Sequence, residues 1–131
     1  MSIGGILLSV IAFMIIGSFW YSGVFLGKVW QKLVKLDFDK MDQEKMTAAF
    51  VSSAAAAFVI ASVLNYLMVE FEVSTIVQAL SFGGMLWLGF SGTAIFVNNT
   101  YQQKPILLTV VDSGYQLVGI LAMSSILYYL I

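Results

Sequence analysis

One acidic side chain lies well inside a long apolar segment, where ionisable groups are rare. Asp112 follows the single proline, Pro105, by seven residues, which is about 10 Å of helix at 1.5 Å per residue. A charge in the middle of a membrane-spanning helix costs at least about 2.5 kcal/mol on insertion scales, so such an acid is a functional-site hypothesis. One interpretation is a proton- or cation-responsive site. The other is an acid whose hydrogen bonds to neighbouring helices fix their packing.

Other polar side chains are expected near the depth of Asp112. Gln116 lies one turn further along the same helical face, with Tyr115 beside it. Tyr21 lies seven residues before Lys28, which gives it a similar depth on the first apolar segment. The candidate intramembrane polar site therefore comprises six side chains: Asp112, Tyr115, Gln116, Trp20, Tyr21 and Asn98. Their depths predict that they converge in the cytoplasmic half of the membrane.

The residue types of most catalytic centres are absent from the chain. It contains no Cys, His or Arg. This removes thiolate chemistry, the commonest general base and metal ligand, and the bidentate clamp for phosphate or carboxylate. Ser22 and Lys28 could form a nucleophile and its base, but their spacing puts them on different faces of a helix. We therefore expect a protein that is not an enzyme, with no cofactor and no metal site.

The composition is that of a membrane protein. Of the 131 residues, 60% are hydrophobic and 10% are charged, and the mean hydropathy is +0.95. A soluble domain is about 45–50% apolar and about 25% charged. The net charge of −1 and the lack of a basic stripe argue against a nucleic-acid partner. The partner that the composition implies is the lipid bilayer.

Charged residues divide the chain into four apolar segments. Nine charges lie between Lys28 and Lys45, two lie at Glu70 and Glu72, and one lies at Lys104. Each apolar segment supplies the roughly 20 residues that a helix needs to cross hydrocarbon. We predict an all-α, polytopic membrane protein. It is a single membrane domain over residues 1–131, a four-transmembrane-helix bundle with helices at about 3–26, 47–69, 75–98 and 106–130.

The loop at 28–46 is amphipathic. Its side chains divide between two faces of a helix, with Val29, Trp30, Leu33 and Val34 on one face and Lys28, Lys32 and Lys35 on the other. We expect this cytoplasmic loop to lie along the headgroup layer, with the lysine stems extended toward water. Trp30 also fits an aromatic belt near a span end. A partner-docking loop and a solvated connection between two spans are both open interpretations.

Small residues favour close packing of helices in membranes. The first span contains the pattern Gly23-x-x-x-Gly27, and the third span contains Gly89 and Gly92. We predict that these four glycines bring helix backbones together, either within one protomer or between protomers.

Two functions fit these observations. The first is a non-enzymatic membrane protein that acts by assembly, as a homo-oligomer or as an accessory subunit bound to another membrane protein. The alternative is a small transporter or channel in which Asp112, Tyr21 and Asn98 line a path. Small multidrug transporters are similar in size, but they carry their essential acid on the first helix, where this chain has none.

Two stretches of the chain resemble a known family. The first is GSFWYS followed by FLGKVW at 17–30, and the second is WLGF at 87–90 followed by KP at 104–105 and DSGYQLV at 112–118. Together they resemble the four-helix bacterial integral membrane family catalogued as domain of unknown function 1761. In that family a proline often follows the Trp-Tyr-Ser triplet, where this chain has Gly23. The resemblance implies the fold and a membrane location, and it adds no activity.

The lysines give the chain a direction in the membrane. All six lie in the first and third loops, whereas the second loop and both ends contain none. Cytoplasmic loops carry the excess of lysine. We therefore predict a multi-pass protein of the cell (inner) membrane with both termini outside the cytoplasm.

A cysteine introduced in the second loop tests this orientation. The chain has no native Cys, so Ser74→Cys supplies a single reactive thiol. A membrane-impermeant thiol reagent added to intact cells is expected to label it. Labelling that occurs only from the cytoplasmic side would reverse the predicted orientation.

Overall fold

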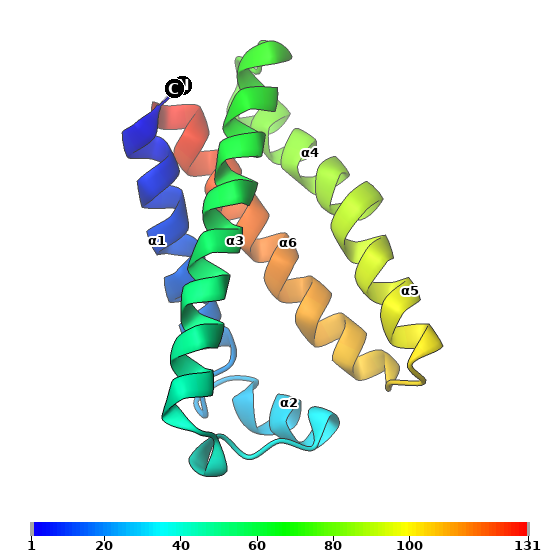
Figure 1. Ribbon diagram of the computed structural model, residues 1–131. Coiled ribbons are helices and arrows are strands. Elements are labelled where there is room, and N and C mark those ends of the chain that lie inside the picture. The colour runs from blue at the N-terminus through cyan, green and yellow to red at the C-terminus, as the bar shows by residue number, and fades with distance from the viewer. Residues whose placement is uncertain (1, 131) are drawn as a thin grey trace.

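The structure is a computed structural model that describes residues 2–130. Helices follow one another along the chain (Figure 1): α1 Ile3–Trp20, α2 Gly27–Val34, the 3-10 turn Phe38–Lys40, α3 Gln43–Glu70, α4 Ile76–Leu86, the π-helical segment Trp87–Gly92, α5 Thr93–Tyr101 and α6 Ile106–Leu130. α4, the π-helical segment and α5 are continuous and form one span. Four spans are therefore long and apolar enough to cross a membrane: Ile3–Trp20, Gln43–Glu70, Ile76–Tyr101 and Ile106–Leu130. The predicted all-α fold with four spans is confirmed.

Side-chain caps fix where two of the spans begin. Asp42 accepts a hydrogen bond from the Glu44 N–H at the start of α3, at 3.1 Å. Thr75 accepts one from the Gln78 N–H at the start of α4, also at 3.1 Å. These oxygens satisfy backbone donors that the first turn of a helix leaves unpaired.

The first span is shorter than predicted. The predicted range of 3–26 is wrong beyond Trp20, because α1 ends there and residues 21–26 form turns before α2 begins. A Cβ at Gly27 would collide with the backbone of this turn, so only glycine permits the chain to pass so closely. Gly23 therefore lies in a turn and Gly27 begins α2, so the two glycines do not share one face of the first span, and their predicted role as a helix-packing face is wrong.

The other spans lie closer to their predicted ranges. α3 covers Gln43–Glu70 instead of 47–69, because its charged first turn is capped and remains helical. The third span extends to Tyr101 instead of 98. The fourth span coincides with the predicted 106–130.

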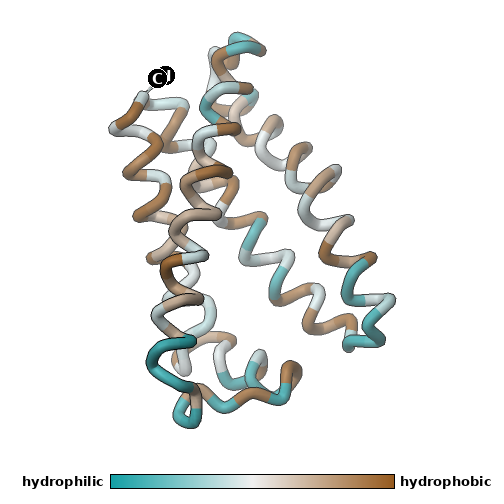
Figure 2. Tube along the Cα trace, in the orientation of Figure 1, coloured by the Kyte–Doolittle hydropathy of each residue, from teal (hydrophilic) through white to brown (hydrophobic). Residues whose placement is uncertain are grey.

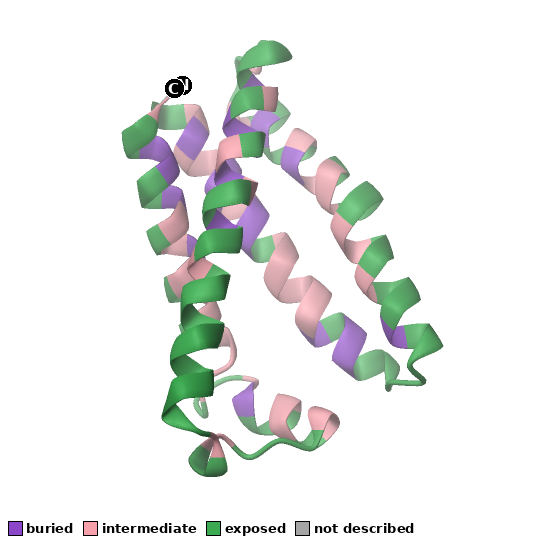
Figure 3. Ribbon diagram, viewed as in Figure 1, coloured by how far each residue is buried: buried purple, intermediate pink, exposed green. Residues whose placement is uncertain are grey.

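α6 is the central helix of the bundle. It packs against α1, α4 and α5, and α3 packs mainly against α1 (Figure 1). Apolar side chains of α1, α3, α4 and α6 form one core: Ile6, Phe13, Ala57, Ala61, Leu64, Met68, Ala79, Ile120, Met123 and Leu127. Figure 3 shows that most of this core lies in the half of the bundle near both chain ends. In the opposite half α3 leaves the bundle, and its residues 42–53 are all exposed.

The outer surface of the spans is apolar. Figure 2 shows the most hydrophilic residues mainly near the loops and span ends, with largely apolar helices between them. Large apolar side chains point away from the core, and Ile15, Val59 and Phe90 are 64%, 59% and 77% exposed. Contiguous apolar surface of this extent is typical of a membrane-embedded protein.

The closest helix contacts occur at glycines other than the four predicted. A Cβ at Gly83 of α4 would collide with the Ser124 hydroxyl of α6. A Cβ at Gly119 of α6 would collide with the Phe13 ring of α1. Both positions bring neighbouring helices together because they lack a side chain.

Two of the predicted packing glycines do not make these closest contacts. A Cβ at Gly89 would have nothing within 4 Å, and a Cβ at Gly92 would meet the Trp87 ring of its own span. The structure therefore gives Gly89 no close contact within the protomer, and packing of these two glycines against another protomer stays a prediction.

Adding one methyl group to α4 tests its contact with α6. Gly83→Ala must displace the Ser124 hydroxyl, and overpacking of this kind costs about 1–3 kcal/mol. Gly84→Ala is the matched control, because nothing lies within 4 Å of its Cβ and alanine favours the helix. We expect thermal unfolding in a mild detergent to give a lower midpoint for Gly83→Ala only. Equal midpoints for the two variants would contradict the α4–α6 contact.

Candidate functional site

The carboxylate of Asp112 accepts two hydrogen bonds from the segment that follows α1. The Tyr21 hydroxyl donates to Oδ1 at 2.7 Å, and the Trp30 Nε1–H donates to the same oxygen at 3.1 Å. The donors precede Asp112 by 91 and 82 residues. These bonds therefore join the α1–α2 segment to the central helix.

The turn after α1 and the helix α2 position the two donors. The turn places Tyr21 directly after α1, and α2 carries Trp30 back toward α6. The two rings meet edge to face with their centroids 5.5 Å apart, an arrangement that aromatic pairs prefer. Trp30 also stacks on Phe38 at a centroid distance of 5.4 Å. This contact holds the end of the loop against α2.

Two further indoles donate to the α6 backbone beside Asp112. The Trp20 Nε1–H donates to the Val111 carbonyl at 2.9 Å, and the Trp87 Nε1–H donates to the Ser113 carbonyl at 2.8 Å. A backbone carbonyl has two lone pairs and can accept a second bond within a helix. Hydrocarbon offers no partner for an indole N–H. The chain's three tryptophans thus all find their acceptors on one turn of α6.

Tyr115 completes an aromatic cluster around this turn. Its hydroxyl donates to the Phe13 carbonyl at 3.1 Å, and its ring centroid lies 4.8 Å from that of Phe13 and 5.4 Å from that of Tyr21. A Cβ at Gly17 would lie 2.7 Å from the phenol oxygen, so the glycine leaves room for the ring. α1 and α6 are therefore joined by aromatic packing as well as by hydrogen bonds.

The structure brings together four of the six residues predicted for the intramembrane polar site: Asp112, Tyr115, Trp20 and Tyr21. Gln116 is partly buried, and its side chain makes no hydrogen bond within residues 2–130. Asn98 is exposed on α5, so its predicted place in the cluster is wrong. Its neighbour Asn99 is buried instead and donates to the Thr109 hydroxyl at 3.1 Å.

Trp30 and Asn99 are polar partners of α6 that the predicted site did not include. Depth along a span does not specify how a helix is rotated, so it cannot show which of two adjacent asparagines points inward. The signal for Trp30 is its place on the apolar face of an amphipathic helix soon after Tyr21. That face packs against the bundle, where an indole N–H needs an acceptor.

One oxygen of Asp112 is held in place by two hydrogen-bond donors, and the other oxygen is not. Both donors bind Oδ1 of Asp112, and the second oxygen accepts no hydrogen bond within the described residues. The part of the chain that the structure describes contains no group of three His, Cys, Asp or Glu that could hold a metal ion. The geometry of the site shows an oxygen of Asp112 that accepts hydrogen bonds from two different aromatic side chains.

The fold and this cluster define a polytopic all-α membrane protein in which aromatic donors converge on one acid of the central helix. The sequence profile of a family described as protein of unknown function (DUF1761) matches residues 5–128. The chain therefore belongs to this family, as its motif stretches predicted. No curated protein and no solved structure matches the chain.

Removing the acceptor is expected to release α2 from the bundle. Asp112→Leu leaves the Tyr21 and Trp30 donors unpaired, and a buried donor without a partner costs about 1–3 kcal/mol. We expect amide hydrogen exchange in Gly27–Val34 to become at least about tenfold faster, as measured by mass spectrometry in detergent. Asp112→Asn keeps an acceptor oxygen and should remain close to the wild type. Asn98→Leu, at an exposed position, is a second control.

Unchanged exchange in α2 after Asp112→Leu would contradict the anchoring role of this acid. Faster exchange throughout the chain would indicate general unfolding. That result would also contradict a role of Asp112 that is limited to anchoring α2.

Proposed function

We propose that this protein acts without catalysis, by assembling in the membrane with a second copy of itself or as a subunit of a larger membrane complex. The observation that carries the proposal is an open apolar groove between α3 on one side and α4, the π-helical segment and α6 on the other. We call this groove the seam.

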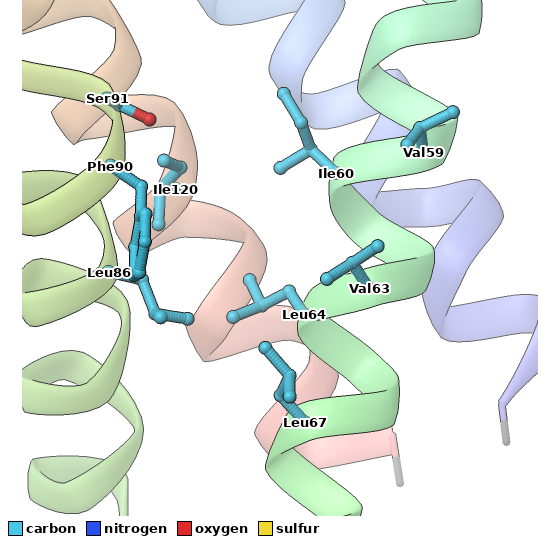
Figure 4. A pocket seen from close by; sticks show the side chains of 9 residues that line it. All are labelled: Val59, Ile60, Val63, Leu64, Leu67, Leu86, Phe90, Ser91 and Ile120. Atoms are coloured by element: carbon cyan, nitrogen blue, oxygen red, sulfur yellow. The ribbon is translucent and has the colours of Figure 1, made fainter. Parts of the chain in front are cut away.

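The seam is built by residues of three spans. Figure 4 shows their side chains around a cavity of about 390 Å³. The lining is apolar except for one hydroxyl, and it consists of Val59, Ile60, Val63, Leu64, Leu67, Leu86, Phe90, Ser91 and Ile120. α3 and α4 touch each other little because each packs chiefly on another helix. α3 and α5 diverge toward the α2 end of the molecule (Figure 1).

Small residues continue the wall of the seam along α3. Ala49, Ser52 and Ala56 precede Val59 and Val63 at spacings of three or four residues, so all of them share one helical face. The three small residues are exposed. Such a face lets the backbone of another helix approach closely, which is how helices associate in lipid.

α3 already packs in this manner within the protomer. Ala57 and Ala61 lie on its core side and are 0% exposed. The exposed part of the helix has the same small-residue character as the packed part. A partner helix in the seam would pack against small residues of α3, as the neighbouring helices of the core already do.

One polar group that lines the seam and one that lies a helical turn from it support a protein partner over lipid. Ser91 lines the cavity, and Gln116 precedes the lining residue Ile120 by one turn of α6. Neither side chain makes a hydrogen bond within residues 2–130. Bonds from Ser and Gln side chains help to join helices in membranes. A second helix can offer such bonds, whereas a lipid chain cannot.

The alternative is a small transporter or channel with Asp112 as its proton- or cation-responsive site. Its support is the second carboxylate oxygen, which accepts no hydrogen bond from the described residues. Ion flux into proteoliposomes that is abolished by Asp112→Asn would favour this alternative over assembly.

Larger side chains on the seam face of α3 should block self-association. We expect Ser52→Leu with Ala56→Leu to raise the dissociation constant at least about tenfold, because two added isobutyl groups keep the backbones apart. The matched control, Val51→Leu with Phe58→Leu, changes exposed apolar residues that lie outside the seam face of α3. Single-molecule photobleaching in bilayers at several protein densities measures the oligomer population.

A wild-type protein that stays monomeric at every density would contradict self-association. A stable oligomer that both double variants leave unchanged would contradict the seam as its interface.

A further inference from the structure

A pocket with three lysines lies beside the start of α3. Its volume is about 520 Å³, and its charged lining side chains are Lys35, Lys40, Lys45, Asp37 and Asp42. All of them belong to the segment that joins α2 to α3 and its first turn. We call this the lysine pocket. It is separate from the seam and from the Asp112 cluster, which share no lining residue with it.

The segment that carries the lysines has a defined conformation. Gln31 Oε1 accepts a hydrogen bond from the Phe38 N–H at 2.9 Å, and Asp37 Oδ1 accepts one from the Asp39 N–H at 3.0 Å. The Phe38 ring stacks on Trp30, which itself donates to the acid of α6. The pocket is therefore tied to the bundle, and its lysines are held near one another.

The charge of the pocket favours an anion. Three ammonium groups stand against two carboxylates in the lining, while Asp39 and Glu44 of the same segment are not part of the lining. Asp37 and Asp42 each use Oδ1 to accept a backbone N–H, which offsets part of their negative charge. The pocket also adjoins the N-terminus of α3, a helix of 28 residues, where the helix dipole adds a partial positive charge.

The pocket lies at the depth of the lipid headgroups. The 28 residues of α3 extend about 42 Å at 1.5 Å per residue, which exceeds the roughly 30 Å of hydrocarbon in a bilayer. The charged first turn, with Glu44 and Lys45, therefore lies outside the hydrocarbon. α2 is suited to the membrane surface, because Trp30 and Leu33 are partly buried while Lys32 is exposed. The anion within reach is a phosphate of the surrounding lipid.

We propose that the lysine pocket binds the phosphate group of an anionic phospholipid from the bilayer. Basic pockets at the ends of spans are suited to such headgroups. Leu36 and Met41 complete the lining and offer apolar contact to the lipid next to its headgroup. A zwitterionic lipid has the same phosphate, but the lysines repel its cationic choline. The pocket therefore selects a headgroup with net negative charge.

Native mass spectrometry of the full chain in a neutral detergent tests the proposal. The probes are phosphatidylglycerol, phosphatidylcholine and inorganic phosphate, each added separately. We expect phosphatidylglycerol to bind at least about tenfold more tightly than phosphatidylcholine. We expect no retention of inorganic phosphate at the same concentration, because it lacks the apolar contact.

Two triple variants locate the site. The test variant replaces the pocket lysines together: Lys35→Gln, Lys40→Gln and Lys45→Gln. The control removes the same charge elsewhere: Lys28→Gln, Lys32→Gln and Lys104→Gln. We expect the test variant to bind phosphatidylglycerol at least about tenfold more weakly than the control. If the test variant does not fold, Lys40→Gln alone is expected to weaken binding about fivefold.

If the two triple variants lose the same affinity for phosphatidylglycerol, net charge alone explains the binding, and the proposal is overturned. Equal binding of the two lipids would overturn it as well, and so would unchanged binding in a folded variant that lacks Lys40. Retention of inorganic phosphate in place of lipid would overturn the assignment of the ligand to the bilayer.

Discussion

The rest of this structure depends on two hydrogen bonds, which the Asp112 side chain accepts from Tyr21 and Trp30. Hydrocarbon supplies no hydrogen-bond partners, so a partner inside the protein strongly stabilises a polar side chain within the spans. Tyr21 and Trp30 find such a partner at one oxygen of Asp112. The backbone carbonyls on either side of Asp112 accept hydrogen bonds from the other two indoles, those of Trp20 and Trp87. Since these donors come from α1, α2 and the third span, one turn of α6 fixes the positions of three other elements.

The two halves of the bundle are consequently held by different interactions. Near the chain ends an apolar core packs α1, α3, α4 and α6 together, with close contacts at Gly83 and Gly119. In the other half α3 moves away, and hydrogen bonds to α6 replace the apolar core. This divergence leaves the seam and the small-residue face of α3 open to the membrane. It also places the lysine pocket at the exposed end of α3.

The number of spans and most of their bounds could be predicted from the sequence, because charged residues interrupt apolar segments of the length that a bilayer requires. The end of α1 could not be predicted, because residues 21–26 are as apolar as the span that precedes them. The turn is marked only by Gly27, where a Cβ would collide with the backbone. The acid and its phenol partner could be predicted from depth along the spans. Trp30 could not be predicted, because its contact with Asp112 depends on the direction that α2 takes after that turn.

The glycines at the closest helix contacts were predicted incorrectly. Small residues show where two helices can approach closely, but the rotation of each helix decides which small residues face a neighbouring helix. Rotation also separates buried Asn99 from exposed Asn98.

The indole N–H signals in a heteronuclear NMR spectrum test the anchoring by Asp112 most directly. The chain has three tryptophans, each with a different acceptor, so one spectrum reports on the whole cluster. We predict three signals that exchange slowly with water. In Asp112→Asn the Trp30 signal should shift strongly, while those of Trp20 and Trp87 should move little because their acceptors are backbone carbonyls. A Trp30 signal that exchanges rapidly with water and does not respond to this substitution would contradict the anchoring of α2 by the acid of α6.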